Sequence, residues 1–394
     1  MEEWKSNLIF SWIAQFFSIM GFSFALPFAP FYLQDLGVTG QAQIRIWSGV
    51  FQSAAGLTMA IMTPLWGYLA DRIGKKPMTL RASLGGAIVL FGMGLAQSPE
   101  MLLTFRFLQG IFTGTTIAYQ TLVVSKTPKE HIGLALGVMN SAIFFGNSVS
   151  PLLGGMFADL FGYRASFFVA ASLLFSSFLM SLIFVRENFR PQSNTTFSLF
   201  SDLKRLLVTA GVFPIIGMIF LYGISRTIQR PVLPLLVQEL VSTNTGLATR
   251  VGLVTSTAGF AAVLAGIIIG VLADRGKSLR VSVFCALFGV LFVSLIVFVS
   301  KIWQLVLLNF LFAFFVGGIN PILKIILTRI VPNEKRGAAF GLVGSARSLG
   351  WFTGSLSGGI VAAIFGLRSV FVIIAALFVV IAGLLALFGR GKEY

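Results

Sequence analysis

The chain is 394 residues long, and 56% of its residues are hydrophobic while only 11% are charged. A soluble domain normally carries about 25% charged residues, so the composition excludes a soluble protein and indicates an integral membrane protein. The formal net charge of +16 would suggest nucleic-acid binding in a soluble protein. Here the cations lie in short segments between apolar runs, which indicates membrane topology and no nucleic-acid partner.

The sequence offers few groups for catalysis or metal binding. Cys285 is the only cysteine and His131 the only histidine, which excludes a disulfide framework, a cysteine-rich or histidine-based metal site and a Ser-His-Asp triad. A Gly-x-x-x-x-Gly-Lys-Ser/Thr motif for ATP is also absent. We therefore expect no enzyme, no cofactor and no metal.

Twelve apolar runs follow one another along the chain. Each is roughly long enough to cross a ~30 Å hydrocarbon core as a helix, and the alternating segments of a β-barrel are missing. The first run is longer than the core of a signal peptide, so we expect it to be a retained span. The runs cover residues 7–34, 44–70, 78–97, 101–125, 132–160, 165–185, 209–238, 247–273, 279–299, 303–328, 337–364 and 368–389. The predicted fold class is an all-α membrane protein with twelve transmembrane helices.

A polar connector divides the twelve runs into two sets of six. It extends from Arg186 to Arg205 and contains the segment Pro191-Gln-Ser-Asn-Thr-Thr, whose composition is typical of a loop. We predict an N-terminal half (1–186), a cytoplasmic linker (187–207) and a C-terminal half (208–394). Most of the 29 Lys and Arg residues fall on the side that holds both termini, which predicts cytoplasmic termini by the positive-inside rule.

The two halves repeat each other at a near-constant offset. Gly154 corresponds to Gly358 and Gly162 to Gly366, and many other residues match at the same spacing. Two parallel, pseudo-symmetric six-helix halves are typical of transporters whose substrate site lies near the membrane midplane between the halves.

Three motifs carry a resemblance to a known family. They read Gly67-x-x-x-Asp71-Arg72-x-Gly74-Lys75-Lys76, Arg106-x-x-Gln109-Gly110 and Gly146-x-x-x-Ser150-Pro151-x-x-Gly154-Gly155. They resemble the loop 2-3 signature, the buried-arginine motif and the exporter motif of the major facilitator superfamily, although the third has Ser-Pro where Gly-Pro is usual. The likeness covers nearly the whole chain and is greatest to bacterial twelve-span drug:proton antiporters, through Leu36-Gly-Val-Thr-Gly, Leu95-Ala-Gln and Arg186-Glu-Asn-Phe.

This resemblance implies residues for coupling, gating and packing. The coupling and gating candidates are Gly67, Asp71, Arg72, Gly74, Lys75 and Arg106, together with Asp274 and Arg275 of the repeated loop. Asp71 can face the positive N-terminal end of a neighbouring helix and so latch one conformation, and Gly67 and Gly74 let helix ends approach and turn. Alternatively, the cations only set topology. Gly146, Pro151, Gly154 and Gly155 allow close helix packing and a bend.

Cations also lie inside the predicted spans. An ionisable group costs at least ~2.5 kcal/mol at the centre of a membrane helix, so each is a functional candidate. Arg226 and Arg230 share one helix face, and Arg347 lies near mid-depth. Lys324 either faces a cavity or reaches the interface. The middle of every span lacks Asp and Glu.

A pump for cationic drugs would need a carboxylate in its cavity. We therefore hypothesise a positive cavity that binds an anionic or zwitterionic amphipathic solute. Its polar and aromatic walls would be Tyr119, Asn140, Tyr222, Gln229 and Asn320. Proton coupling stays open, because protonation could occur on Asp35, on Asp71 or on the substrate, or the protein could be an exchanger or a uniporter.

The leading interpretation is a monomeric secondary exporter in the bacterial cytoplasmic (inner) membrane, working by alternating access with protons as the coupling ion. One alternative is an uptake carrier or uniporter for an organic anion or a sugar, against which the exporter motif argues. A non-transporting membrane sensor is a second alternative, but its loops would need to hold a soluble domain, and they are short.

Overall fold

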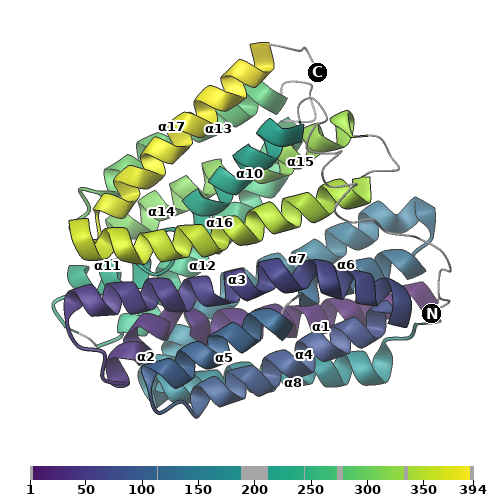
Figure 1. The fold of residues 1–394 in the computed structure, drawn as a ribbon, viewed down its shortest axis with the longest axis horizontal. Helices are drawn as coiled ribbons and strands as arrows, with labels where there is room; N and C mark the ends of the chain where they lie inside the picture. The colour runs from purple at the N-terminus through teal and green to yellow at the C-terminus, as the bar shows by residue number, and fades with distance from the viewer. Residues whose placement is uncertain are drawn as a thin grey trace. The chain divides into compact units, whose positions relative to one another are not determined.

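A computed structural model describes residues 3–112, 114–187, 212–243, 245–272, 278–331 and 336–390. In these ranges the chain forms helices joined by turns and short loops, and no strand occurs (Figure 1). The predicted linker lies outside the described residues apart from Glu187, and so do Asp274 and Arg275.

The first six predicted spans correspond to one helix or to consecutive helices. The elements are α1 (Glu3–Ala25), η1 (Leu26–Phe28), α2 (Ala29–Asp35), α3 (Gln41–Ile73), α4 (Lys75–Gly94), α5 (Pro99–Phe112), α6 (Thr115–Lys126), η2 (Lys129–His131), α7 (Ile132–Phe161) and α8 (Tyr163–Phe184). Two of these spans, the first and the fourth, are interrupted. Pro27 accounts for the first interruption because it lies at the start of η1 and has no N–H to donate.

The last six spans follow the same pattern. The elements are α10 (Val212–Thr227), α11 (Leu233–Leu240), α12 (Leu247–Leu272), α13 (Ser278–Ile296), α14 (Ile302–Gly317), α15 (Ile319–Ile330), α16 (Arg336–Phe365) and α17 (Ser369–Arg390). The seventh and tenth spans are interrupted, at the positions that the internal repeat pairs with the interruptions in the first and fourth.

Eight helical runs of the described residues are long and apolar enough to cross a membrane, and Val212–Thr227 is a shorter apolar helix. The protein is therefore a multi-pass membrane protein. The interruptions leave the helices of the fourth and seventh spans shorter than this criterion requires. The helix α4 carries three cations, Lys75, Lys76 and Arg81.

The internal repeat is visible in matching corners of the fold. Gly162 separates α7 from α8 at a φ of 85°, and Gly366 separates α16 from α17 at a φ of 90°, a backbone region that favours glycine. Just after each turn an arginine donates to a main-chain carbonyl. Arg164 reaches the oxygen of Ala96 at 3.0 Å, and Arg368 reaches that of Val297 at 2.6 Å.

The chain divides into two compact units, which are described separately. Unit 1 comprises Met1–Thr39, Leu57–Thr195 and Thr243–Ser256, and unit 2 comprises Gly40–Gly56, Thr196–Ser242 and Thr257–Tyr394. Each unit thus contains most of one sequence half together with a short segment of the other. The helices α3 and α12 each contribute residues to both units.

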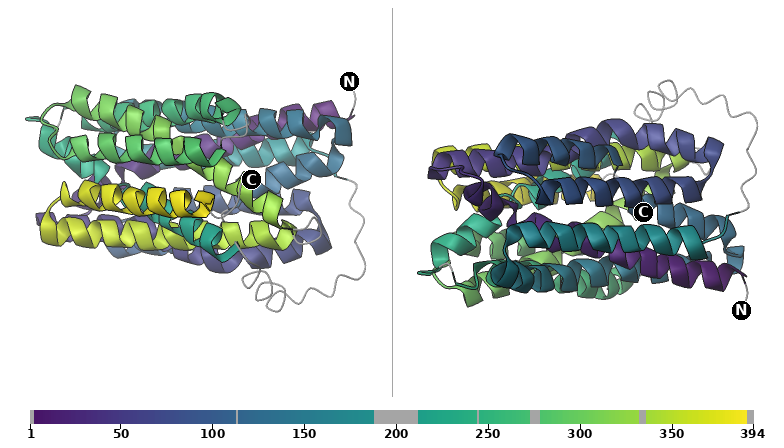
Figure 2. Two further views of the ribbon diagram at one scale, coloured as in Figure 1. Left: turned by 90° about the horizontal axis from the view of Figure 1, so that it is seen from above. Right: turned by 90° about the horizontal axis from the view of Figure 1, so that it is seen from below.

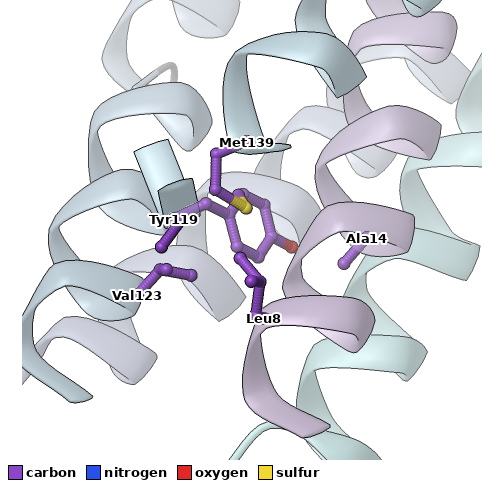
Figure 3. Packing of buried hydrophobic residues seen from close by; sticks show 6 residues of the cluster. Leu8, Ala14, Tyr119, Val123 and Met139 are labelled. Carbon is purple, nitrogen blue, oxygen red and sulfur yellow. The ribbon is translucent and has the colours of Figure 1, made fainter. Parts of the chain in front are cut away.

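In unit 1, α1 packs against α7 and α8, and α4 packs against α8. A buried cluster between α1, α6 and α7 contains Leu8, Ala14, Tyr119, Val123 and Met139 (Figure 3). In unit 2, α10 packs against α16, and α13 packs against α14 and α17. The helices α16 and α17 of unit 2, drawn in yellow-green and yellow, meet near the turn at Gly366 and diverge from there (Figure 1), while the view from above overlays them (Figure 2).

Glycines set how closely these helices approach. A Cβ on Gly154 of α7 would overlap the carbonyl oxygen of Phe24 in α1. A Cβ on Gly358 of α16 would likewise overlap the carbonyl oxygen of Ile228. The two glycines are equivalent in the repeat, so both units use the same device to bring backbones together.

Candidate functional site

The candidate site begins at the break in the seventh span. The helix α10 ends at Thr227 and α11 starts at Leu233, because Pro231 cannot donate a helical hydrogen bond. The intervening turn is closed by hydrogen bonds from the Arg230 N–H to Thr227 O at 3.0 Å and from the Leu233 N–H to Gln229 O at 2.8 Å. Arg230 therefore lies in a turn inside an apolar span.

Four cations gather around this turn in unit 2. They are Arg226 on the last turn of α10, Arg230 in the break, Lys324 on α15 and Arg347 on α16. Arg230 is close enough to Arg226 and Arg347 to be repelled by both, and Lys324 is repelled by Arg347. Arg230 and Arg347 are exposed, and Arg226 and Lys324 are partly buried. None of the four forms an ion pair with a carboxylate in the part of the chain that the structure describes.

Aromatic rings lie beside two of these guanidinium groups. The Cζ atom of Arg226 is 5.8 Å from the centre of the Phe312 ring, and that of Arg230 is 5.2 Å from the Trp351 ring, within the range of cation–π attraction. Tyr222 stands nearly perpendicular to Phe378, with an interplanar angle of 86°. The cationic cluster is therefore bordered by apolar faces.

Two buried polar atoms of this region have no hydrogen-bond partner among the described residues. They are Nη1 of Arg226, a donor, and Oε1 of Gln229, an acceptor. A buried polar group without a partner costs about 1–3 kcal/mol, and more when it is charged. Both atoms are therefore buried at a cost that no hydrogen bond among the described residues offsets.

The tenth span breaks beside the cluster. The helix α14 ends at Gly317 and α15 starts at Ile319, and the Tyr222 hydroxyl donates to Val316 O at 3.3 Å, next to the break. The fourth span breaks in the equivalent place, at Gly114 with a φ of 119°, where the Trp66 Nε1–H donates to Ile111 O at 2.7 Å. Sequence reasoning missed both breaks, although glycines mark them.

The structure brings Arg226, Arg230, Lys324, Arg347 and the side chain of Tyr222 into one region of unit 2. Gln229 lies in the same turn as Arg230, and Asn320 lies one helical turn before Lys324 on α15. The remaining two predicted wall residues, Tyr119 and Asn140, belong to unit 1. Asn140 is exposed and accepts a hydrogen bond from Gln120 Nε2 at 3.0 Å.

The prediction that Tyr119 lines a substrate cavity is wrong for this structure, because the residue has no exposed surface. Its hydroxyl lies within 3.2 Å of Ser83 Oγ, 2.9 Å of Ser177 Oγ and 2.6 Å of Ser181 Oγ. In Figure 3 the ring lies inside the bundle, with the hydroxyl directed toward the side of Ala14. Small hydroxyl side chains on α4 and α8 satisfy the phenol there, so it fills the interior of unit 1.

The predicted coupling residues of the loop 2-3 motif lie at the junction of α3 and α4. Gly74 turns the chain with a φ of 103°, and the guanidinium of Arg72 lies 4.4 Å from the ring centre of Tyr68. A Cβ on Gly67 would meet no described atom within 4 Å. The side chain of Asp71 is outside the described residues.

A carboxylate that the sequence analysis did not select holds this junction. Glu187 accepts hydrogen bonds from the backbone N–H groups of Lys75, at 2.9 Å, and Lys76, at 2.7 Å. These N–H groups are the unsatisfied donors at the start of α4, where the helix dipole also favours a negative charge. Glu187 therefore fixes the geometry of the motif, and only its place in Arg186-Glu-Asn-Phe hinted at a role.

Replacing Glu187 with alanine is expected to lower the free energy of unfolding by about 1 kcal/mol, as loss of a helix cap does. Thermal unfolding of the detergent-solubilised protein measures this change. Glu130→Ala removes a carboxylate from the exposed segment η2 and serves as the control. An equal effect of the two substitutions would contradict the capping role.

Arg106 is 1% exposed and donates to Gln109 Oε1 one helical turn further along α5. Both residues belong to the second motif and lie in unit 1, as does the packing motif of α7. There a Cβ on Gly146 would lie 2.7 Å from Ile19. These contacts connect α7 with α1 and place the second and third motifs in the interior of the bundle.

Comparison of the sequence with protein families identifies the family of the chain. The family model of the Major Facilitator Superfamily matches residues 11–218 and 215–393 of the chain. The chain belongs to the major facilitator superfamily. It is thus a membrane transporter and not an enzyme, and its two matched segments correspond to the internal repeat.

Relatives within the superfamily include the multidrug resistance protein MdtG of Salmonella choleraesuis (strain SC-B67) and of Salmonella typhimurium (strain LT2). Each is 35% identical over 378 residues, which cover 94% of this chain and 92% of the relative. Among solved structures, the human organic anion transporter MFSD10 has a TM-score of 0.73 at 16% identity, covering 98% of this chain and all of the other. The nucleoside transporter NupG has a TM-score of 0.78 at 17% identity, covering 98% and 99%. These structures support the fold of a major facilitator transporter.

Proposed function

We propose that this transporter exports anionic or zwitterionic amphipathic organic solutes, including drugs, from the bacterial cytoplasm across the inner membrane. In this proposal both termini are cytoplasmic, and the protein acts as a monomer. The halves 1–186 and 208–394 alternate access to the site, and proton entry drives export. The MdtG relatives, named for multidrug resistance, support the direction and the breadth of substrate.

The observation that carries the substrate class is the cluster of Arg226, Arg230, Lys324 and Arg347 without a carboxylate partner among the described residues. Guanidinium groups bind carboxylate and phosphate oxygens through two parallel charge-assisted hydrogen bonds. A solute with a negative group would also relieve the repulsion among the four cations, whereas a lipophilic cation would add to it. The ring of Trp351, which is partly buried, offers surface for the apolar part of the solute.

Transport into inside-out vesicles or proteoliposomes tests this proposal with pairs of fluorescent solutes that share a ring system and differ in charge. We expect uptake of the anionic and zwitterionic members and little uptake of the cationic one. Preferential uptake of lipophilic cations would reject the anion site.

The same proteoliposomes test proton coupling. An imposed pH gradient, acidic on the vesicle interior, is expected to accelerate solute accumulation, and an ionophore that collapses the gradient should remove the effect. Transport that follows only the solute gradient would instead indicate a uniporter, and transport that needs a second anion on the opposite side would indicate an exchanger.

A further inference from the structure

Two seams of close helix contact lie at the helix ends that the proposed topology places outside the cell. The first, the α7–α12 seam, joins residues 151–159 of α7 to residues 248–256 of α12 and lies within unit 1. A Cβ on Gly155 would overlap the carbonyl oxygen of Ala248, and a Cβ on Gly252 would overlap that of Pro151. The backbones therefore touch directly along this seam.

Asp159 ties the end of this seam. Its carboxylate accepts hydrogen bonds from the backbone N–H groups of Ala248, at 3.0 Å, and Thr249, at 2.8 Å, and from the Thr249 hydroxyl at 2.5 Å. These N–H groups belong to the first turn of α12, where the positive end of the helix dipole lies and the donors lack intrahelical partners. A side chain at the end of the fifth span thus caps a helix of the other sequence half.

The second, the α3–α16 seam, lies within unit 2 and has the same construction. A Cβ on Gly49 would lie 2.8 Å from the Cα of Gly359. Arg45, in the first turns of α3, donates from Nη1 to the carbonyl oxygen of Ala362 at 3.0 Å. That carbonyl lies in the last turn of α16, where the helix dipole is negative and favours a cation.

The internal repeat relates the two seams, because it pairs α3 with α12 and α7 with α16. Asp159 occupies the place of Ala363, next to the acceptor Ala362, and Thr249 occupies the place of Arg45. In one seam the charge is a carboxylate at a helix N-terminus, and in the other it is a guanidinium at a helix C-terminus. The two seams thus join equivalent pairs of helix ends through side chains of opposite charge.

We propose that Asp159 and Arg45 are latch residues that hold the outer ends of the two halves together, and that both latches open when the transporter exposes its site to the outside. This inference rests on the alternating access of the proposed function, because each seam joins a helix of 1–186 to a helix of 208–394. Asp159 is exposed and Arg45 is partly buried, so water can replace their bonds. Such modest, solvent-screened contacts suit a latch that opens in every cycle.

Cysteine accessibility on whole cells tests the first latch. Cys285 is the only cysteine, and the background for the assay is the Cys285→Ser variant. A new cysteine, Val251→Cys, then reports on the α7–α12 seam, because Val251 lies one helical turn after Ala248 and is fully buried. A membrane-impermeant maleimide is added outside. We expect Asp159→Ala to raise the labelling rate about 5- to 30-fold, the factor that corresponds to 1–2 kcal/mol, and Asp159→Asn to raise it less because the amide oxygen still accepts.

The matched control is Glu100→Gln, which removes another exposed carboxylate from the first turn of a helix, α5, on the same membrane side. It is expected to leave the labelling of Val251→Cys unchanged.

The second latch is tested with a different reporter. Ser48 lies beside Gly49 and is fully buried, so Ser48→Cys reports on the α3–α16 seam. Arg45→Ala is expected to increase the labelling of this cysteine.

Unchanged labelling of both reporters in Asp159→Ala and Arg45→Ala would overturn the proposal. If Asp159→Ala fails to fold, Thr249→Val carries the test, because it deletes only the hydroxyl bond to Asp159, and an unchanged rate there would count against the latch. The assay needs no substrate. Altered labelling together with a preference for cationic solutes would reject the proposed substrate class and keep the latch, whereas unaltered labelling with anion transport would reject the latch alone.

Discussion

Arg226→Ala is expected to weaken the transport of anionic solutes by about 10- to 100-fold, seen mainly as a higher KM. A hydrogen bond to a charged group contributes about 1.5–3 kcal/mol, and each 1.4 kcal/mol corresponds to a factor of ten in binding. Arg226→Lys should fall between wild type and alanine, since the ammonium keeps the charge and loses the planar pair of donors. Concentration-dependent uptake into proteoliposomes measures these values.

The same substitution is expected to raise the thermal stability of the empty transporter. Arg226 is repelled by Arg230 and holds a buried Nη1 without a partner among the described residues. Its removal therefore relieves a charge repulsion and the cost of burying an unpaired donor. An anionic solute should raise the Tm of the wild type by mass action and raise that of the variant less. A residue with a purely structural role would instead lower the Tm when truncated.

Arg280→Ala is the matched control, because Arg280 is an exposed cation near the start of α13 and its loss changes the net charge by the same amount. We expect its KM to equal that of the wild type. An unchanged KM for anions in a folded Arg226→Ala protein would reject the role of Arg226 in binding.

Gly154→Leu is expected to prevent folding. The smaller substitution Gly154→Ala should lower the free energy of unfolding by about 1–3 kcal/mol or more, the range of overpacking substitutions. The atom that a new Cβ would overlap is the backbone oxygen of Phe24, which cannot move aside as a flexible side chain could. The yield of monodisperse protein in fluorescence-detected size exclusion, and the Tm of the surviving variant, measure the effect.

Gly137→Ala provides the contrast on the same helix. A Cβ at Gly137 would meet no described atom within 4 Å, and alanine is about 1 kcal/mol more favourable than glycine in a helix. The substitution is therefore expected to be neutral or stabilising. If both alanine variants behaved alike, the contact between α7 and α1 would not be the reason for the glycine at position 154.

The helices were predictable from the sequence because a membrane span needs a continuous run of apolar residues, which can be read from the sequence without knowledge of tertiary contacts. Each predicted apolar run coincides with a helix or with consecutive helices, and the repeat located Gly162 and Gly366 at equivalent turns. The interruptions at Gly114 and Gly318 were missed, since glycine in a membrane span is equally compatible with close packing. The backbone of the folded chain distinguishes the two cases, through the φ of 119° at Gly114 and the hydrogen bonds from Trp66 and Tyr222 to carbonyls next to the breaks.

The candidate site was partly predictable for the same reason. The cost of a charge in an apolar span selected Arg226, Arg230, Lys324 and Arg347, and the structure brings them together. Polarity alone misplaced Tyr119, because the serines that satisfy its hydroxyl lie on helices distant in sequence. Glu187 and Asp159 were not selected, because their partners are backbone N–H groups that no residue pattern reveals.

The exchange of segments between the two units has a consequence for biosynthesis. A ribosome delivers the chain from its N-terminus, and compact units generally fold as soon as they are complete. Unit 1 still lacks 243–256 when the sixth span enters the membrane, so Asp159 waits for Ala248 and Thr249. Residues 40–56, made early, wait even longer for α16. Neither unit is complete until the translocon has released spans of both halves, which links insertion of the second half to maturation of the first.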